Sequence, residues 1–530
     1  MICSSIITFK LLCWYIMRIG IDVGGTNTDA VLIGNNGIIS WCKTPTTKDI
    51  SKGIIKALTE VMIKGNQKAE NILAVMIGTT HFTNAVVERK KLLEIGIIRL
   101  GLPATSGVMP LSDWPNDLSI VLGNNIFLAH GGYEFDGRKI SDIIDVELEK
   151  ICLEIKKKEL RAVAITSVFS PVKTNQEEYV SNFIKNQIPE IKISLSNEIG
   201  RVGFLERENA CIMNACLLDL AHEVVSSFKH ALRLLNIKAP FFISQNDGTL
   251  MSAEHVMKYP VLTFASGPTN SMRGAANQSK LNEAMIVDIG GTTSDIGMLL
   301  NGFPREASVG VEIGGVRTNF RMPDVLAIGL GGGSLVSDEG NKIGPESVGF
   351  ELLEKSLVFG GDVLTATDIA VASGILKVGD RRKVEKISSK IIINAQKTMH
   401  KMLDDAIDKM KTSPEKLPVI LVGGGSILIN EDLPSASEII RPKLASVANA
   451  VGAGIAQVGG EVDRIFSIDD VGREKALKLA TEEASNKAIK AGAISSTINV
   501  LDIEEIPLAY LPSNASRIRV KVVGDLEMSK

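Results

Sequence analysis

Short apolar runs alternate along the chain with longer stretches in which apolar residues recur every three or four positions. The short runs predict β-strands, and the periodic stretches predict helices. We expect strands at 74–80, 162–169, 240–248, 284–291 and 418–425. We expect helices at 51–64, 175–187, 205–235 and 386–411. This alternation is typical of parallel sheets covered by helices, so it predicts an α/β fold.

The predicted strands are followed by glycine or by a cluster of polar residues. Open α/β sheets bind their ligands at the carboxyl ends of their strands. We therefore expect the functional residues at those ends.

One pattern occurs twice. Residues 17–37 read MRIGIDVGGTNTDAVLIGNNG, and residues 284–303 read AMIVDIGGTTSDIGMLLNGF. The alignment places Asp22 on Asp288, Gly24 and Gly25 on Gly290 and Gly291, Thr26 on Thr292, and Asp29 on Asp295. A single DxGGT is typical of a tight hairpin, whereas two copies, each between apolar runs, indicate a duplicated functional unit.

A strand that ends in Gly-Gly-Thr lets backbone N–H groups approach an anion closely, since glycine has no side chain in the way. The spacing therefore predicts two phosphate-binding turns. Their cofactor-binding residues are Gly24, Gly25, Thr26, Asn27 and Thr28 in the first turn, and Gly290, Gly291, Thr292 and Thr293 in the second. The aspartates would repel a bare phosphate, so Asp22 and Asp288 predict a Mg²⁺ ion between them. Two such turns facing each other would clamp a polyphosphate.

A third glycine turn is needed to bind a nucleoside, because phosphates alone do not select ATP. The candidates are Gly423, Gly424 and Gly425 in PVILVGGGSILI. For the similar turn at 331–333, close packing of a helix on a strand is an equal alternative. The sequence contains neither GxxxxGK[ST] nor GxSxG, which excludes a P-loop and a serine-hydrolase elbow.

Length and charge narrow the class of protein. A chain of 530 residues is too long for one core. Its 58 basic and 61 acidic residues show no basic stripe with interleaved aromatics, so we do not expect nucleic acid as a partner. The six cysteines form no CxxC pair, which favours reduced thiols in a cytoplasmic setting and disfavours structural zinc.

Two changes of character along the chain predict domain boundaries. We expect an N-terminal lobe at 17–195, a second lobe with the nucleotide site at 196–460, and a small α+β segment at 461–530. Residues 1–16 are apolar but lack a basic region and a cleavage site, so they predict a non-structural extension and no membrane anchor.

The paired DxGGT hairpins and the late GGG turn resemble the two-lobed actin-like ATPase fold, with its duplicated ribonuclease-H-like domains, of sugar kinases, hexokinase and heat-shock chaperones. More narrowly, the chain resembles the A-subunit type of the hydantoinase/5-oxoprolinase family over nearly all of 17–525. The matching segments include GTTHFTNAVVERK (78–90), SQNDGTLMSAEHV (244–256), IGGVRTNFRMPDVLAIGLGGGS (313–334) and IPLAYLPSNASRIRVKVVGD (506–525).

The resemblance implies an ATP- and Mg²⁺-dependent hydrolase that opens a cyclic amide or imide, such as a hydantoin, 5-oxoproline or a related lactam. Phosphorylation of the carbonyl oxygen would activate an otherwise poor electrophile toward water. The resemblance also implies a separate B-type partner subunit in many relatives. The sequence does not decide whether the chain forms a homo-oligomer or which ring it opens.

The resemblance carries roles onto particular residues. Asp22 and Asp288 would hold the metal and, with Thr292, serve catalysis. Thr79, Thr80 and Asn84 would bind the substrate, and His81 would carry a proton, although a structural histidine is an alternative. Asp29 and Asp295 are expected to be acceptors that stabilise the turns, and Glu88 and Arg89 are expected to form a surface pair.

Two departures put the usual substrate in doubt. The chain has SGPTNS (266–271) where relatives carry SGPAGG, and FELLEKSLVFGGD (350–362) where they carry a segment with proline and cysteine. A small-molecule kinase and a nucleotide-switched activator therefore remain alternative functions. For an activator with an iron–sulfur cluster, Cys211 and Cys216 are poor ligands, and we expect them in the core.

Overall fold

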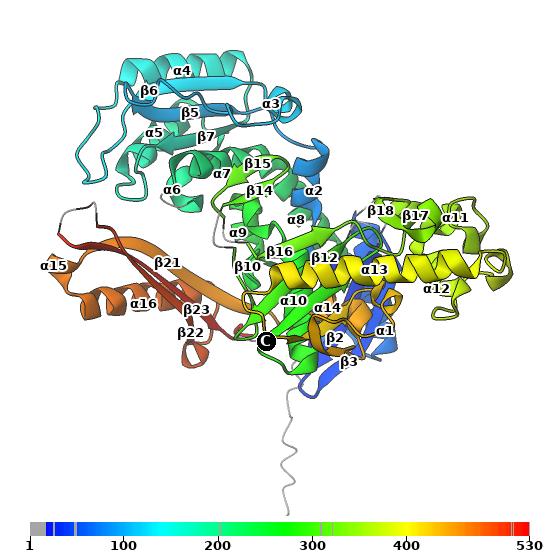
Figure 1. Cartoon of the computed structure of the whole chain (residues 1–530). Helices are drawn as coiled ribbons and strands as arrows, with labels where there is room; N and C mark the ends of the chain where they lie inside the picture. Colours follow the sequence, from blue (N-terminus) through cyan, green and yellow to red (C-terminus); the bar gives the residue numbers. More distant parts are fainter. Residues whose placement is uncertain are drawn as a thin grey trace, which may run out of the picture.

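The computed structural model describes residues 17–24, 27–46, 50–200, 203–307, 310–320, 322–509, 511 and 513–528. Two sheets form its centre (Figure 1). Residues 1–16, and with them the predicted N-terminal extension, lie outside the described residues.

The first sheet has nine strands in the order β22-β23-β21-β10-β9-β4-β1-β2-β3. Their bounds are β1 Met17–Val23, β2 Asn27–Gly34, β3 Gly37–Pro45, β4 Ile72–Thr79, β9 Phe241–Ser244, β10 Thr249–Ser252, β21 Gln457–Ser467, β22 Asn499–Pro507 and β23 Ala515–Gly524. β1 pairs antiparallel with β2 and parallel with β4, and β4 pairs parallel with β9. In the part of the sheet from β3 to β9, the strands β3, β2 and β1 thus pair antiparallel, and β4 and β9 extend the sheet with parallel pairings.

The second sheet repeats this arrangement in the order β13-β12-β11-β19-β20. Its strands are β11 Ala284–Ile289, β12 Ser294–Leu300, β13 Phe303–Pro304, β19 Leu417–Val422 and β20 Ala436–Ile440, and β16 Val325–Ile328 also pairs with β12. β11 pairs antiparallel with β12 and parallel with β19. The repeat in the sequence is therefore a repeat in the topology.

Apolar alternation explains why both faces of these sheets are covered. Ile19 and Ile21 pack in one core with α1 (Ile50–Lys64), whereas Gly20 between them faces α14 (Ala448–Ile455). In the second sheet the odd-numbered side chains of β11 pack with α13 (Ser389–Met410), and the even-numbered Ile286 packs with α10 (Ser266–Ser279). Because both faces are buried, the strands appear in the sequence as continuous apolar runs.

The helices α10 and α14 cross between the two sheets with their backbones in contact. A Cβ atom on Gly274 of α10 would overlap the carbonyl of Ala448, and one on Gly452 of α14 would overlap that of Asn270. These two glycines therefore allow the close approach that joins the two lobes.

Further units are attached to this centre (Figure 1). A separate parallel sheet in the order β6-β5-β7-β8 uses β5 Gly96–Leu102, β6 Asn125–His130, β7 Ala162–Ser167 and β8 Lys192–Leu195. Its helices are α3 Asn116–Leu122, α4 Asp145–Lys157 and α5 Asn175–Gln187. Small hairpins are β14 Val311–Ile313 with β15 Val316–Thr318, and β17 Ser334–Ser337 with β18 Lys342–Ser347. The remaining helices are α2 His81–Glu88, α6 Ser196–Ile199, α7 Phe204–Cys216, α8 Leu218–Leu234, α9 Ala253–Lys258, α11 Leu352–Lys355, α12 Ala366–Ala372, α15 Ile468–Val471 and α16 Arg473–Lys490.

The expected strands and helices are present, with one difference. The helix predicted at 205–235 is two helices, α7 and α8, which meet at Leu217 with a bend of 51°. The sequence has no glycine or proline there, so its pattern gave no sign of the break. Leu217 is fully buried, and the bend keeps the apolar sides of both helices in one core.

The sheets do not follow the expected boundaries at 195 and 460. Strand β9 pairs with β4, so 241–244 joins the sheet of the first lobe, and β21 extends that sheet through β10. The physical reason is that strand pairing over long sequence separations depends on backbone edges that meet in space, which local periodicity does not report.

Among the described residues, no single helix is long and apolar enough to cross a membrane; α7 and α8 reach that length only as a bent pair. The four described cysteines, Cys42, Cys152, Cys211 and Cys216, are free and buried. The expectation that Cys211 and Cys216 belong to the core is confirmed.

Candidate functional site

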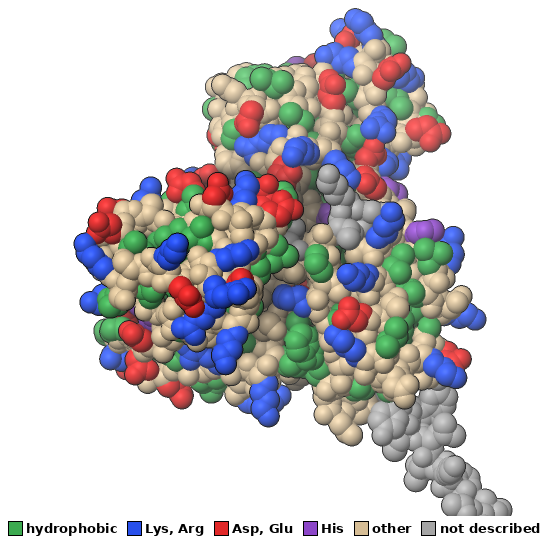
Figure 2. Space-filling model, turned by 90° about the vertical axis from the view of Figure 1, so that its right-hand side faces the viewer, with side chains coloured by type: hydrophobic (Ala, Val, Ile, Leu, Met, Phe, Trp, Pro, Cys, Tyr) green, Lys and Arg blue, Asp and Glu red, His purple; other side chains and the backbone are tan. Residues whose placement is uncertain are grey.

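The two glycine turns meet in one cavity of about 430 Å³. Asp22, Gly24 and Asn27 line it from the first lobe, and Asp288, Gly290 and Gly291 line it from the second. The third predicted turn, Gly423 to Gly425, also lines the cavity. In the space-filling view a hollow runs between the two lower masses, and Lys, Arg, Asp and Glu side chains are mixed on this face (Figure 2).

The two turns have the same local geometry. Asp22 lies opposite Asp29 in the first hairpin, and Asp288 lies opposite Asp295 in the second. The N–H of Gly24 donates to the carbonyl of Asn27 at 3.0 Å, and the N–H of Gly290 donates to that of Thr293 at 2.9 Å. The same sequence thus produces the same turn in both lobes.

Several predicted residues lie beside the cavity rather than on its wall. Thr28 is fully buried, and its Oγ1 is 3.2 Å from that of Thr46. Thr293 is exposed and Thr292 is half-buried, and neither lines the cavity. Gly25 and Thr26 lie outside the described residues.

The glycine turn at 331–333 supports the second DxGGT turn. The N–H of Gly332 donates to the carbonyl of Gly290 at 3.0 Å, and that of Gly333 donates to Gly291 at 2.7 Å. Gly332 also lines the cavity, and Thr367 Oγ1 donates to its carbonyl at 2.7 Å. This turn is therefore a close backbone packing that also forms part of the cavity wall.

Burial dominates the electrostatics of Asp22. The side chain accepts a hydrogen bond at Oδ2 from Asn449 at 2.7 Å, while Oδ1 is buried and has no partner among the described residues. Burial, with the nearby carboxylates of Asp29 and Asp288, raises the pKa of Asp22 to about 7.

Of the other carboxylates of the two hairpins, Asp29 is buried, and Asp288 and Asp295 are half-buried. Asp288 accepts a hydrogen bond from Ser271, and burial raises its pKa. Burial and the Asp288 charge raise the pKa of Asp295 to about 7. Asp29 pairs with Lys43 at 2.7 Å instead of accepting from its own turn, and burial raises the pKa of Asp29 despite that pair.

The residues present fit a Mg²⁺ ion. The buried carboxylate of Asp22 and the half-buried carboxylate of Asp288 reach one cavity from opposite lobes, and one oxygen of Asp22 lacks a donor among the described residues. Among the described residues, no three His, Cys, Asp or Glu side chains form a complete metal cage. Mg²⁺ is commonly held by one or two carboxylates together with water and substrate phosphates, so a complete protein cage is not required.

The sequence-based prediction missed five polar residues that line the cavity: Lys43, Ser271, Thr367, Ser446 and Asn449. Lys43 lies opposite Asp29 in the register of β2 and β3, so the hairpin pattern contained a signal for it. Ser271 and Asn449 come from α10 and α14, and nothing in their local sequence places them near the turns.

The cavity has an apolar side as well as a polar one. Its lining includes these apolar residues: Leu352, Phe359, Leu376, Val378 and Ile427. A polar floor of glycine turns and carboxylates beside an apolar wall suits a ligand with a charged part and a flat apolar part.

The predicted substrate residues lie at the same edge of the first sheet. β4 runs parallel to β1, with Gly78 opposite Asp22 and Thr79 opposite Val23. Thr79 is buried, and Asn84 Nδ2 donates to Thr80 Oγ1 at 3.4 Å. These residues adjoin the cavity without lining it.

His81 is held by its neighbour. Its Nδ1 lies 2.5 Å from Thr79 Oγ1, and the Thr79 hydroxyl also accepts from the His81 N–H at 3.3 Å. Burial and the Lys91 charge lower the pKa of His81 to about 4. The ring is therefore neutral at pH 7, and the tautomer decides whether its Nδ1 accepts the Thr79 proton or donates to the Thr79 oxygen.

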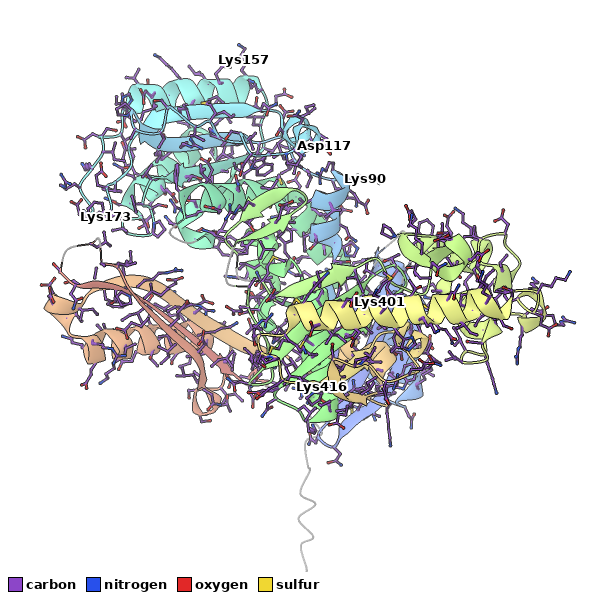
Figure 3. All side chains as sticks on the ribbon, in the orientation of Figure 1. Lys90, Asp117, Lys157, Lys173, Lys401 and Lys416 are labelled. Carbon is purple, nitrogen blue, oxygen red and sulfur yellow. The ribbon has the colours of Figure 1, made fainter. Side chains whose placement is uncertain are left out.

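The expected pair of Glu88 and Arg89 is wrong. Arg89 binds Asp117 at 3.0 Å and the carbonyl of Gly314 at 2.8 Å, whereas Glu88 binds Lys90. Arg89 has a left-handed backbone at the end of α2, and its Nη1 donates to the carbonyls of Val86 and Val87, so the side chain caps the helix end instead of pairing with Glu88. Figure 3 shows Asp117 and Lys90 near the end of α2.

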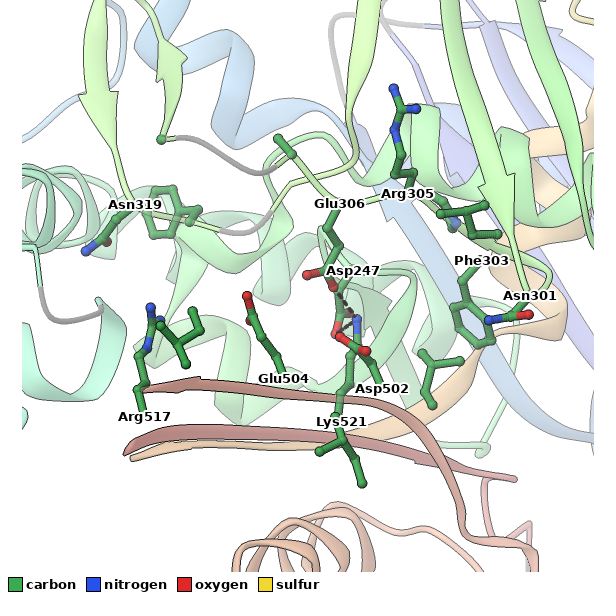
Figure 4. Close-up of a pocket in the computed structure, with 18 of the residues that line it drawn as sticks. Asp247, Asn301, Phe303, Arg305, Glu306, Asn319, Asp502, Glu504, Arg517 and Lys521 are labelled. Carbon is green, nitrogen blue, oxygen red and sulfur yellow. Dashed lines mark hydrogen bonds and ion pairs between the residues drawn. The ribbon is translucent and has the colours of Figure 1, made fainter. Parts of the chain in front are cut away.

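A larger cavity of about 690 Å³ contains none of the predicted site residues (Figure 4). Its central cation, Lys521, pairs with Asp247 at 3.1 Å and Glu306 at 3.0 Å. The neighbouring Arg519 pairs with Asp502 and Glu306, each at 2.9 Å. These ion pairs connect β23 to a turn of the first sheet and to a segment of the second lobe.

Two models of one protein family match the chain. The hydantoinase/oxoprolinase N-terminal region matches residues 18–188, and the hydantoinase/oxoprolinase model matches residues 207–380.

Curated relatives are distant. An uncharacterized protein of Methanocaldococcus jannaschii is 25% identical over 86% of this chain and 75% of its own length. Caprolactamase subunit alpha of Pseudomonas jessenii is 24% identical over 68% of this chain and 55% of its own length. Acetophenone carboxylase gamma subunit of Aromatoleum aromaticum is 23% identical over 68% of this chain and 53% of its own length. The chain spans about half the length of these last two relatives.

Solved structures share the fold over almost the whole chain. The ATP-dependent caprolactamase from Pseudomonas jessenii superposes with a TM-score of 0.78 at 17% identity, over 96% of this chain and 88% of that one. Nucleotide-free acetone carboxylase superposes with a TM-score of 0.69 at 16% identity, over 97% of this chain and 89% of that one. With the duplicated sheet order, this likeness confirms the expected actin-like ATPase fold.

Proposed function

Because this chain belongs to the hydantoinase/oxoprolinase family, we propose that it uses ATP to open the ring of a cyclic amide or imide. The observation that carries the proposal is the meeting of the two DxGG turns in one cavity, with the carboxylates of Asp22 and Asp288 on its wall. A caprolactamase subunit among the relatives supports a lactam or a related ring as the substrate class.

The proposed roles follow from the geometry. The N–H groups of the two glycine turns would bind the phosphates, and Lys43, held by Asp29, would neutralise phosphate charge. Asp22 and Asp288 would hold Mg²⁺, which supplies positive charge for phosphoryl transfer when it is bound. The apolar wall with Phe359 and Gly423 to Gly425 would hold the nucleoside.

The amide would lie at the end of β4, beside Thr79, Thr80 and Asn84. Transfer of the γ-phosphoryl group from ATP to the amide oxygen makes the ring carbon more electrophilic, so that water adds to it and the C–N bond breaks, with the ring nitrogen leaving as an amine. A second water would then hydrolyse the acyl phosphate that remains and release phosphate. The net products are ADP, phosphate and the ring-opened acid. A neutral His81 near this edge would accept a proton from the attacking water, through a rotated ring that releases Thr79.

A second candidate function is ATP-dependent carboxylation of a ketone. The acetophenone carboxylase subunit matches the chain to nearly the same extent as the caprolactamase subunit does. Both relatives are named as subunits, which supports a partner chain for the activity of this protein as well.

The test incubates the purified chain with Mg²⁺ and ATP, alone and with a B-type subunit of the family. A panel of lactams, hydantoins and 5-oxoproline is compared with a ketone plus labelled bicarbonate. We expect ADP, phosphate and ring-opened product to form in equal amounts. A stable phosphorylated product would instead indicate a kinase, and label in a carboxylate would indicate the carboxylase. ATP turnover that ignores every cyclic amide would refute the proposed substrate class.

Two matched variants test the clamp itself. A Cβ atom on Gly291 or Gly424 would meet nothing within 4 Å, so Gly291→Ala and Gly424→Ala leave the packing intact. The added methyl groups would enter the space of the bound nucleotide. We expect kcat/KM for ATP to fall about 100-fold, the order of losing one preorganised phosphate contact, with an unchanged Tm. Full activity in both variants would remove the clamp from the proposal.

A further inference from the structure

A third cavity, of about 560 Å³, lies at the beginning of β1, at the other end of that strand from Asp22. We call it the arginine cavity, because Arg18 and Arg273 line it. β1 and the β2–β3 turn form one side, α10 forms another, and residues around 455–457 and 525–528 complete it.

Arg273 is buried with its charge poorly matched. The residue is 7% exposed, and its Nη1 has no acceptor among the described residues. Its Nη2 donates to Gln457 Oε1 at 3.4 Å, a long hydrogen bond. Its guanidinium carbon lies 3.8 Å above the centre of the Phe303 ring, and burial lowers its pKa to about 10.

Arg18 is in a similar situation. It is half-buried and forms no side-chain hydrogen bond or ion pair with any residue that the structure describes; burial lowers its pKa, and the charge of Asp525 opposes this shift. Asp525 is the one carboxylate among the residues found to line the cavity, and its Oδ1 already accepts from Gln457 at 2.9 Å. Two guanidinium groups thus share the cavity with a single, partly satisfied carboxylate.

Partly desolvated guanidinium groups without anionic partners are costly, and arginine forks bind phosphate and carboxylate oxygens in paired hydrogen bonds. We propose that the arginine cavity binds a small oxyanion, a phosphate or carboxylate group, between Arg18 and Arg273. Asn277 also lines the cavity and adds a polar side chain, and Ile455, Leu526 and Met528 add apolar ones beside which a short hydrocarbon part would fit.

The anion would act on the nucleotide cavity through α10. Ser271 of this helix binds Asp288, and Arg273 follows two residues later. An oxyanion between Arg18 and Arg273 would therefore fix α10 against β1, and with it the position of Asp288. This link rests on the proposed function, whose products, phosphate and a carboxylate, both carry the required chemistry.

The test measures thermal unfolding of the full chain against inorganic phosphate and, separately, malonate, each matched to potassium chloride of equal ionic strength. A second series contains Mg²⁺, ADP and beryllium fluoride to fill the nucleotide cavity. The variants are Arg18→Gln and Arg273→Lys. Arg138→Gln, on an exposed side chain in the separate sheet unit, is the control for the loss of one charge.

We expect one of the two anions to raise the Tm in both series, with about tenfold or greater loss of apparent affinity in Arg18→Gln and none in Arg138→Gln. The anion that binds more tightly identifies the group that the cavity selects. Equal shifts in the wild type and Arg18→Gln, or no shift with either anion, would overturn the proposal. Retained anion binding without any ATP turnover would refute the proposed function alone.

Discussion

Asp22 is 4% exposed, yet one of its carboxylate oxygens has no hydrogen-bond partner among the described residues. Burial, together with the charges of Asp29 and Asp288, raises its pKa to about 7. Such an arrangement destabilises the protein without ligand. It is consistent with a site whose charge is balanced when a cation binds.

The first prediction concerns the pH dependence of this cost. The Asp22 pKa is about 7 in the folded state and near 3.8 in the unfolded state. Stability relative to alkaline pH is therefore complete below pH 3.8, where Asp22 is protonated in both states, and is lost as the pH rises through 7 and the folded carboxyl ionises. Asp22→Asn removes the ionisation. We therefore expect the variant without Mg²⁺ to be more stable than the wild type by up to about 4 kcal/mol at pH 8, and by less than about 1 kcal/mol at pH 4.

Urea unfolding at the two pH values measures this difference. Asp142→Asn, at a 79% exposed side chain, is the matched control and should show no such dependence on pH. Added Mg²⁺ should reduce the advantage of Asp22→Asn at pH 8, because the cation stabilises the ionised wild-type carboxylate. A variant that is less stable than the wild type at pH 8 would contradict the interpretation.

At the scale of elements, the crossing of α10 and α14 decides how the two lobes meet. α10 contributes Ser271 and α14 contributes Asn449 to the cavity between the glycine turns, where they donate to Asp288 and Asp22 respectively. The close backbone contact at Gly274 and Gly452 therefore positions one hydrogen-bond donor for each carboxylate.

The second prediction follows from this contact. Gly274→Ala places a methyl group where the carbonyl of Ala448 lies, and backbone cannot move aside as a flexible side chain can. We expect a loss of about 3 kcal/mol or more in the free energy of unfolding, at the upper end for overpacking. Gly107→Ala, where a Cβ meets nothing within 4 Å, is the control. Equal stability of both variants, measured by denaturant unfolding, would show that the crossing is adaptable.

At the scale of the whole molecule, a group of buried ion pairs around Lys521, which we call the ionic joint, connects the C-terminal unit to the rest of the protein. Lys521 of β23 is 3% exposed and pairs with Asp247 and Glu306, which come from the two different lobes. Glu306 is shared with Arg519. The unit that extends the first sheet is thereby connected to the second lobe as well (Figure 4).

The third prediction tests this joint. Lys521→Met leaves two carboxylates without their shared cation, and removal of one partner from a buried pair costs about 3 kcal/mol or more. Lys401→Met, on the exposed surface of α13, removes the same charge and should have little effect (Figure 3). We expect the loss to appear in the urea midpoint of Lys521→Met alone. Matching midpoints in the two variants would show that the joint adds no stability.

Local sequence determined much of this protein. The duplicated DxGGT pattern specified two hairpins with matching strand pairing, since glycine placement and strand alternation act over a few residues. The apolar runs specified strands that are buried on both faces. Lys43 was within reach of the same reasoning, because the register of the first hairpin places it opposite Asp29.

The tertiary structure decided what no local pattern encodes. Ser271 and Asn449 reach the cavity because two helices separated by more than 160 residues cross at their glycines. Strands β21 to β23 joined the first sheet instead of forming a separate appendage, and Arg18 met Arg273 in one cavity. Periodicity reports which face of an element is buried, but the partner of that face depends on long-range packing.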